Sequence, residues 1–404
     1  MRDTQLYARI LGIDRPWKVT DVELDLPADE VRVRVAHGEG PLHCPECGAA
    51  CGGYDKRERR WRHLDTCQYR TILVADVPRV KCTEHGVKQV SVPWAEPGGR
   101  FTAMFEALVI DWLQEASIAA VARQLGLSWD EVDTVMKRAV QRGLSRRDFE
   151  PVRHVAVDEL GRRRGHHYLT VVSDREHDRV VHVEPERKAS SLSAFYEQQG
   201  EQGCAAIESV TMDMWGPYIA ATREHVPDAE RKIAFDKFHV AQHLGDAIDT
   251  VRRREHKRLK AEGDEQLAGT RYLWLKHPNN VSDRDWRGRF KALRESTLQT
   301  ARAWAIRETA MSLWDYRSRA WATKAWRRWY AWAIRSRLEP VKRVARMIKR
   351  HLQGIVNAVV LRATNARAES INNRIQRVKR MACGFRNTER FQRAIYFHLA
   401  ALDL

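Results

Sequence analysis

The sequence lacks any apolar run that approaches the roughly 20 residues a membrane-spanning helix needs. Its first residues, MRDTQLYARILGIDRPW, are charged and contain only short apolar patches, so they do not resemble a secretion signal. Both absences argue against a membrane-embedded or exported protein. We therefore expect a soluble, cytoplasmic chain.

Cysteine is also scarce, with 7 residues in a chain of 404. An odd number of cysteines in a long chain without a secretion signal argues against a disulfide framework. Metal ligands or free thiols are the favoured roles for these side chains.

Acidic residues are outnumbered, with 53 Asp plus Glu against 70 Lys plus Arg and a formal net charge of +17. This excess favours a polyanionic partner, and nucleic acid is the commonest one. The alternative is a solvated basic surface without a partner. The length leaves room for several domains.

Two short motifs near the start have zinc-ligand spacing, Cys44-x-x-Cys47 and Cys82-x-x-His85. The alternating pattern of residues 21–36 predicts a β-hairpin before them, and β-rich segments lie between them. A unit of this size lacks the core to fold alone, which a closed zinc site would remedy. Incidental buried cysteines are the alternative. Three further residues compete as ligands, namely Cys51, His63 and Cys67.

The basic segment 56–62 lies between the two motifs and is interpreted as an arm that contacts phosphates. The composition of residues 93–100 predicts a linker. Helical spacing follows at 101–115, 117–125 and 129–142, with Gly126 in the turn between the last two. This order predicts a helix-turn-helix, and a three-helix support without DNA contact is the alternative.

Two aspartates are expected at the ends of buried strands. Asp158 follows the apolar run 155–157, and Asp213 follows the run 210–212. Strand signals at 152–157, 167–172, 179–184, 207–212 and 231–235, with helices near 190–200 and from Pro217, predict an α/β domain. The two carboxylates share one sheet edge only if their strands are neighbours, which the sequence leaves open.

A third acid lies on the helical segment 364–380. At helical spacing Glu369, Asn372, Asn373, Gln376 and Arg380 share a polar face, and Ala368, Ile371, Ile375, Val378 and Ala382 share an apolar one. Two strand-end aspartates and a helical glutamate can converge on Mg²⁺, which takes oxygen ligands. Two such ions about 4 Å apart stabilise both oxygens of an in-line phosphoryl displacement.

Two other acids qualify this interpretation. Glu389 is a rival for Glu369, although a first-turn position after Thr388 favours a helix-terminal role. Asp236, in the segment Asp236–His239, either caps the next helix, with His239 packed beside the core, or helps to position DNA or a metal-bound water.

Residues 240–360 are basic and strongly helical in composition, and they are rich in tryptophan. Trp314, Trp321 and Trp332, with Ala325 between them, fit a heptad-like stripe, so we expect most of these rings to pack in a core. Base stacking at a distorted DNA end is the alternative.

Five segments carry a resemblance to a known family: TNARAESINNRIQRVKRMACGFRN, VAVDE, VTMDMW, FDKFHV and CPECG. Together they resemble the ISL-three family of bacterial insertion-sequence transposases over nearly the whole chain. The resemblance implies a DDE enzyme whose catalytic, metal-binding acids are Asp158, Asp213 and Glu369. It also implies Mg²⁺ (or Mn²⁺) in the catalytic site and an N-terminal structural Zn²⁺. The second zinc motif of the family usually has two cysteines, so His85 is a departure.

The expected fold class is multidomain α+β. An RNase H-like α/β catalytic core is interrupted by a large helical insertion and preceded by a zinc-ribbon-like domain and a helix-turn-helix domain. The expected domains are 1–95 (hairpin and zinc), 96–148 (helix-turn-helix), 149–245 (first segment of the core), 246–358 (Trp/Arg-rich insertion) and 359–404 (second segment of the core).

The expected function is that of a DNA transposase, which binds terminal inverted repeats and catalyses cleavage and strand transfer. Its partners would be double-stranded DNA, as repeats and as target, and one or more further copies of the chain, as a homodimer or larger assembly on DNA in association with the nucleoid. The alternatives are a zinc-containing DNA-binding regulator with an inactive core, and a structure-selective RNase H-like nuclease or resolvase. The expected DNA contacts are Arg57, Arg59, Arg60, Arg62, Lys137, Arg138, Arg374, Arg377, Lys379 and Arg380.

Overall fold

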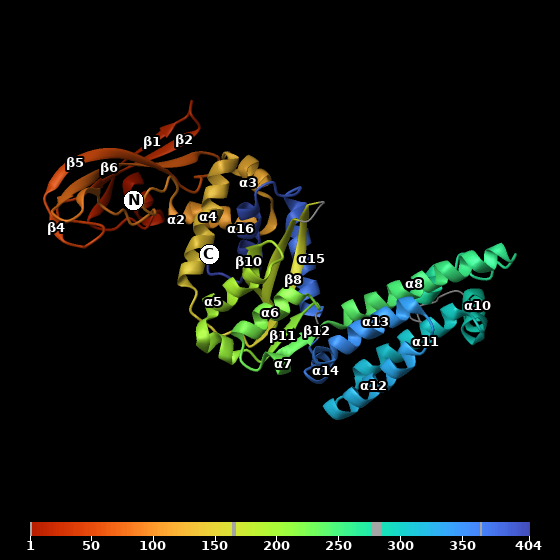
Figure 1. Cartoon of the computed structure of the whole chain (residues 1–404). Coiled ribbons are helices and arrows are strands. Elements are labelled where there is room, and N and C mark those ends of the chain that lie inside the picture. Colours follow the sequence, from red (N-terminus) through yellow and green to blue (C-terminus); the bar gives the residue numbers. More distant parts are fainter. Residues whose placement is uncertain (1, 164–166, 277–283, 364–365) are drawn as a thin grey trace. The chain divides into compact units, whose positions relative to one another are not determined.

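The computed structural model (Figure 1) describes residues 2–163, 167–276, 284–363 and 366–404. The side chains of 162, 163, 167, 284–286 and 366–368 are outside this description. The predicted helical positions Thr364 and Asn365, and the side chain of Ala368, therefore lie outside the described residues. The chain divides into two compact units, Met1–Gly143 with Leu404, and Leu144–Asp403. The finer division into five domains stays a prediction.

The first unit contains a sheet with the strand order β1-β2-β6-β5, and β7 pairs with β6. Its strands, together with the short pair β3 and β4, are β1 Trp17–Asp25, β2 Glu30–His37, β3 Leu42–His43, β4 Ala50–Cys51, β5 Gly53–Arg62, β6 Arg70–Cys82 and β7 Gly86–Gln89. The predicted hairpin is confirmed, because β1 and β2 are antiparallel with Asp25 opposite Glu30. The segment 56–62, interpreted as an arm that contacts phosphates, is a paired strand and not a projecting arm, and its contact with phosphates stays a prediction. This segment lies in β5, which pairs with β6 along its length.

The core of the first unit is built on tryptophan contacts. Trp94 packs edge-on against Trp17 (ring centroids 4.9 Å apart) and against Trp61 (5.4 Å). Both Trp61 and Trp94 are buried. The segment 93–100, predicted as a linker, therefore contains a residue that is anchored in the core, Trp94, although it forms no helix or strand.

The helices of the first unit are α1 Asp3–Ile10, α2 Ala103–Glu115, α3 Ile118–Leu125 and α4 Trp129–Arg146. Helix α3 begins and ends at the residues predicted from the sequence. Ser117 accepts a hydrogen bond from the backbone of Ala120 (3.3 Å), and Gly126 ends the helix with a left-handed φ of 64°. Helix α4 starts with a capping box between Ser128 and Glu131, in which Glu131 Oε2 accepts from the backbone of Ser128 (2.8 Å).

The second unit contains a sheet with the order β10-β9-β8-β11-β12. Its strands are β8 His154–Arg163, β9 His167–Asp174, β10 Arg179–Pro185, β11 Ser209–Met212 and β12 Ile233–Phe235. Strands β8, β9 and β10 form an antiparallel meander, and β11 is parallel to both β8 and β12. The expected strands are present. The question that the sequence left open is also answered, since β8 and β11 are neighbours.

Helices cover both faces of this sheet. On one face, Val157 of β8 belongs to a buried cluster with Phe195 of α5 (Ala189–Ala206) and Tyr218 of α6 (Gly216–His225). On the other face, Leu160 of β8 packs in a cluster with Ile371 of α15 (Ala366–Met381). The predicted apolar face of segment 364–380 is confirmed at three positions, because Ile371, Ile375 and Val378 are buried.

Helix α16 (Thr388–Leu399) packs on the same face of the sheet as α15, since its Phe391 and Ile395 are buried in the cluster that contains Leu160 and Ile371. Asn387, and not Thr388, is the N-cap of α16, because Asn387 Oδ1 accepts from the backbone of Arg390 (3.1 Å). The rival acid Glu389 lies exposed in the first turn of this helix.

Between the sheet and α15 the chain is helical. The elements are α7 Ala229–Lys232, α8 Lys237–Ala261, α9 Arg271–Leu275, α10 Arg284–Glu295, α11 Gln299–Ser312, the 3₁₀ turn η2 Leu313–Asp315, α12 Arg319–Ile334, α13 Glu339–Arg350 and α14 Leu352–Val360. Helix α8 crosses the expected domain boundary at 245/246 without interruption. None of the described helices is long and apolar enough to cross a membrane.

The predicted tryptophan stripe is wrong, although most of the rings do pack. Trp326 and Trp329 are buried, whereas Trp321 is 60% exposed and Trp332 is 41% exposed. Trp314 lies in η2, before the chain turns into α12, so a helical repeat counted from Trp314 does not continue into that helix. Within α12, residues 322, 326, 329 and 333 form the buried face.

Candidate active site and zinc site

The two strand-associated aspartates lie at the same end of neighbouring strands. Asp213 directly follows Met212, the last residue of β11. Asp158 is not at the end of its strand as predicted, because β8 continues to pair with β9 and places Asp158 opposite Val171. The pairing of β8 with β11, however, ends at Ala156 and Thr211. Asp158 therefore lies two residues past that last pair.

Asp158 is half-buried and held by specific donors. Asn372 Nδ2 donates to Asp158 Oδ2 (2.7 Å), and the backbone N–H of Glu159 donates to Oδ1 (2.8 Å). Burial raises the pKa of Asp158, and the negative charge of Asp236 adds to this rise, while the hydrogen bond from Glu159 and the charge of His239 oppose it. A desolvated carboxylate near a second carboxylate is a group that a bound cation would stabilise.

Asp213 has a different set of partners. Its Oδ2 lies 3.4 Å from Arg187 Nη2, and its Oδ1 lies 3.9 Å from His239 Nδ1. Arg187 also pairs with Glu159 (2.6 Å), and its guanidinium lies 4.3 Å from the ring centroid of Trp215. Burial raises the pKa of Glu159 to about 7, against the opposing charge of Arg187.

Arg187 and Glu159 were not predicted from the sequence. Glu159 could have been noticed as the second acid of VAVDE. Arg187 follows β10 in a segment without a motif, so no local signal marks it.

Glu369 lies exposed in the first turn of α15. It lines a pocket of about 1000 Å³ together with Asp158, Asp236, His239 and Asn372. The structure thus brings Asp158 and Glu369 to one pocket, and His239 connects this pocket to Asp213. Among the described residues, the three carboxylates do not lie close enough together to form a group of metal ligands. The one such group in the described residues is formed by Cys44, Cys47, Cys82 and His85.

Asp236 is the N-cap of α8, since its buried carboxylate accepts from the backbone N–H of Phe238 (3.2 Å). The capping interpretation is therefore confirmed. His239 is partly exposed and its Nδ1 lies 3.9 Å from Asp213 Oδ1, and the auxiliary role of Asp236 and His239 stays a prediction.

In the first unit the four predicted zinc ligands come together. The ligand atoms of Cys44, Cys47, Cys82 and His85 all lie within 4.8 Å of one another. Cys47 Sγ is 3.7 Å from Cys82 Sγ, and His85 Nδ1 is 3.7 Å from Cys82 Sγ and 3.9 Å from Cys44 Sγ. Zn–S bonds of about 2.3 Å in a tetrahedron require S–S separations of about 3.8 Å. The donors therefore fit a zinc ion.

The surroundings of the cluster favour metal binding. Backbone N–H groups of His85 and Glu84 lower the pKa of Cys82 to about 7, which favours the thiolate that zinc requires. Glu46 lies 3.6 Å from His85 Nε2, where it can orient the ring so that Nδ1 faces the sulfurs.

The competing ligands lie outside the four-residue cluster. His63 is buried and its Nδ1 is hydrogen-bonded to Thr102 Oγ1 (2.8 Å). Cys51 donates to the carbonyl of Ala49 (3.4 Å), and Cys67 is exposed.

The candidate DNA contacts of the first unit differ in how firmly they are held. Those on β5 are Arg57, Arg59, Arg60 and Arg62. Arg62 pairs with Asp65 (2.5 Å) and Arg60 pairs with Glu58 (2.9 Å), and both Arg57 and Arg60 are exposed. On α4, Lys137 is exposed, whereas Arg138 pairs with the buried carboxylate of Glu106. DNA contact by Arg138 stays a prediction. The observed partner of Arg138 is Glu106 on the nearby helix α2.

The candidate contacts on α15 are Arg374, Arg377, Lys379 and Arg380. Arg374 pairs with Asp178 (2.8 Å), and Lys379 donates to the carbonyl of Gly161 (3.1 Å). Arg377 and Arg380 line a hollow of about 420 Å³ with Glu369.

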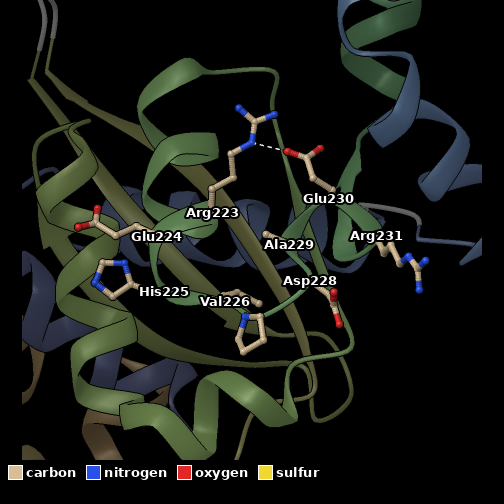
Figure 2. Close-up of a pocket in the computed structure, with 9 residues that line it drawn as sticks. Arg223, Glu224, His225, Val226, Asp228, Ala229, Glu230 and Arg231 are labelled. Atoms are coloured by element: carbon tan, nitrogen blue, oxygen red, sulfur yellow. Dashed lines mark hydrogen bonds and ion pairs between the residues drawn. The ribbon is translucent and has the colours of Figure 1, made fainter.

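A separate hollow of about 480 Å³ lies at the α6–α7 connection (Figure 2). Within it Arg223 Nε donates to Glu230 Oε1 (2.6 Å). Because residues 229–232 precede β12 and Asp236 follows it, this hollow lies at the opposite end of β12 from the acids.

Comparison with known proteins gives three matches to family models. Residues 155–395 match the ISL3 model described as "Transposase". Residues 90–140 match "Helix-turn-helix domain of transposase family ISL3", and residues 40–85 match "zinc-finger of transposase IS204/IS1001/IS1096/IS1165". The first match alone spans more than half of the chain.

Two curated proteins are similar over most of their lengths. The transposase for insertion sequence element IS1001 of Bordetella parapertussis is 30% identical over 353 residues, which are 86% of each chain. The transposase for insertion sequence element IS1557 of Mycobacterium tuberculosis is 29% identical over 421 residues, covering 96% of this chain and 94% of the relative. The chain, with its zinc-finger and helix-turn-helix regions, belongs to the ISL3 family of insertion-sequence transposases.

Proposed function

We propose that the chain is a DDE transposase that binds the terminal inverted repeats of its element and cuts and joins DNA with Asp158, Asp213 and Glu369. The observation that supports this most is the placement of Asp158 and Asp213 beside the same end of the β8–β11 pairing. Glu369, more than 200 positions after Asp158 in the sequence, lines the same pocket as Asp158.

The topology supports an RNase H-like core. Three antiparallel strands followed by two parallel ones, in the order β10-β9-β8-β11-β12, match the arrangement expected of that fold, with helices on both faces. The helices from α8 to α14 lie between Asp213 and Glu369 in the chain, and we interpret them as the insertion.

The acids fit divalent cations of the Mg²⁺ or Mn²⁺ type, because carboxylate oxygens are the donors that such ions prefer, and Asp158 is desolvated with an acidic neighbour. Two bound cations would supply Lewis-acid stabilisation of the attacking and leaving oxygens. Asn372 holds Asp158 in place, and Arg187 holds Asp213. Hydrolysis at the element end breaks a P–O3′ bond, which frees the 3′-hydroxyl of the element and leaves the phosphate on the flanking strand. That hydroxyl then attacks a phosphodiester of the target DNA, which forms a new P–O bond and releases a 3′-hydroxyl of the target strand.

The first unit would supply recognition of the ends. A zinc ion held by Cys44, Cys47, Cys82 and His85 would fix the β3–β4 and β6–β7 turns, and the helix-turn-helix would contact the duplex. Exposed cations such as Arg57, Arg60 and Lys137 would neutralise phosphates, so binding should weaken steeply with salt. A dimer or larger assembly would pair the two ends of the element on the nucleoid.

The test uses Asp158→Asn, Asp213→Asn and Glu369→Gln, each with a duplex that carries the terminal inverted repeat. Each variant should bind the duplex with wild-type affinity and lose magnesium-dependent cleavage. The proposal is overturned if all three variants cleave at the wild-type rate.

A further inference from the structure

The pocket that contains Asp158 and Glu369 is also lined by aromatic and basic residues, which have no role in the proposed catalysis by the acids. Five of its residues come from the start of α8, from the segment after η2 and from the segment after α14: Lys237, Phe238, Tyr316, Arg317 and Arg362. We call these five residues the aromatic wall. All of them are exposed.

Two rings of the aromatic wall are open to solvent. Phe238 is 61% exposed and Tyr316 is 38% exposed, which leaves the apolar surface of both rings uncovered. Phe238 is fixed in direction, because its backbone N–H donates to the Asp236 cap and its ring packs edge-on against His239 (centroids 5.8 Å apart). An exposed ring on a fixed backbone is suited to stack on a flat partner.

Trp314, two positions before Tyr316 in the chain, is held by two ring contacts. The Trp314 ring packs edge-on against the buried Trp326 (centroids 6.0 Å apart), and the ammonium of Lys237 lies 6.0 Å from the Trp314 centroid. The turn η2 therefore contacts the start of α8, and Phe238 and Tyr316 line one pocket.

Three basic side chains line the same pocket as the two rings. Lys237, Arg317 and Arg362 form no ion pair with any other residue in the described part of the chain. The acids that line the same pocket are Asp158, Asp236, Asp315 and Glu369. Three exposed cations beside two rings favour a ligand that has both phosphates and flat apolar surfaces. Nucleotides have this composition.

We propose that the aromatic wall binds unpaired nucleotides at the DNA end, with bases against Phe238 and Tyr316 and phosphates near Lys237, Arg317 and Arg362. Inside a duplex both faces of each base are covered by its neighbours, so a ring in a pocket can stack on an internal base only after that base has left the stack. The pocket volume of about 1000 Å³ is sufficient for such a ligand. This inference rests on the proposed function, since it places the unpaired strand beside the acids.

Binding without cleavage tests the aromatic wall directly. The probes are a fluorescein-labelled blunt duplex with the terminal inverted repeat, and the same duplex extended by a short unpaired tail, both in buffer without magnesium. The wild-type chain should bind the tailed duplex about tenfold more tightly, since each base stacked on an aromatic ring contributes a factor of about that size. The double variant Phe238→Ala/Tyr316→Ala should lose this preference and keep its affinity for the blunt duplex.

Two control variants identify the cause. Phe238→Leu keeps apolar bulk without a π-face and should also reduce the preference. Tyr272→Ala removes a ring that is 64% exposed on α9, outside this pocket, and should leave the preference intact. Because Phe238 and Tyr316 are exposed, their truncation leaves the core unchanged. A wild-type chain without preference for the tail, or a double variant that keeps it, overturns the inference.

Cleavage separates this inference from the proposed function. On a fully paired end Phe238→Ala should cleave about tenfold more slowly than the wild-type chain, and on an end with mismatched base pairs the difference should disappear. An equal loss on both substrates would indicate a structural role and contradict the inference. If the three acid variants still cleave, the proposed function fails even where the tail preference is present. If they are inactive and the preference is absent, the aromatic wall alone is refuted.

Discussion

Asn372 on α15 donates a hydrogen bond of 2.7 Å to the carboxylate of Asp158 on β8, across 214 positions of sequence. The contact is possible because successive side chains of β8 point to opposite faces of the sheet. Leu160 packs against α15, and Asp158, two positions earlier, faces the same side of the sheet. This hydrogen bond therefore fixes the helix that carries Glu369 against the strand that carries Asp158.

Replacement of Asn372 should reduce catalysis more than folding. Asn372→Ala removes one hydrogen bond to a carboxylate, which contributes about 1.5–3 kcal/mol. We expect cleavage of terminal-repeat DNA to fall by at least about tenfold, with unchanged end binding, in single-turnover assays. Asn373→Ala, one position along and exposed, is the matched control and should cleave normally. Equal rates for the two variants would show that the hydrogen bond does not position the acid.

Zinc content should follow the four-residue cluster. Purified wild-type chain should contain one zinc ion, Cys82→Ser should lose it and bind DNA ends poorly, and His85→Cys should retain it because thiolate and imidazole are both zinc ligands. Cys51→Ser and Cys67→Ser should keep full zinc content, measured by atomic emission. Zinc loss in Cys51→Ser, or retention in Cys82→Ser, would reassign the ligands.

Acid should destabilise the first unit through His63. Burial lowers the pKa of His63 from 6.5 to about 4, so the folded chain resists a proton that the unfolded chain accepts. Stability is therefore complete above pH 6.5 and is lost as the pH falls from 6.5 towards 4. Between pH 7 and pH 5 the loss is about 2 kcal/mol. In thermal melts of the full chain His63→Gln should show a smaller decrease over this range, and parallel pH profiles would contradict the assignment.

The packing of α14 on β12 should tolerate no side chain at Gly354. A Cβ at this position would overlap the ring of Phe235, the residue before Asp236. Gly354→Ala should therefore destabilise the chain by about 1–3 kcal/mol and lower cleavage. Gly288 in α10 has no neighbour where its Cβ would lie, so Gly288→Ala should stabilise the chain by up to about 1 kcal/mol. A rise in melting temperature for both variants would refute the predicted overlap.

The sequence predicts what local patterns determine. The apolar face of α15 was predictable because Ile371 and Ile375 repeat at helical spacing. The zinc ligands were predictable because each pair of ligands is separated by two residues and lies on a single turn. The sequence did not reveal that β8 continues past Asp158, since that depends on pairing with β9. Arg187 was missed because its partners Glu159 and Asp213 lie on other strands. The exposure of Trp321 depended on where α12 begins, which composition does not show.

The central claim is that Asp158, Asp213 and Glu369 bind the same divalent cations during DNA cleavage. The most direct test replaces each acid by cysteine and compares cleavage of the terminal-repeat duplex in Mg²⁺ and in Mn²⁺. Thiolate is a poor ligand for Mg²⁺ and a better one for Mn²⁺. We predict no cleavage by Asp158→Cys, Asp213→Cys or Glu369→Cys in Mg²⁺, with partial recovery in Mn²⁺. Wild-type cleavage in Mg²⁺ by any of the three would contradict the account.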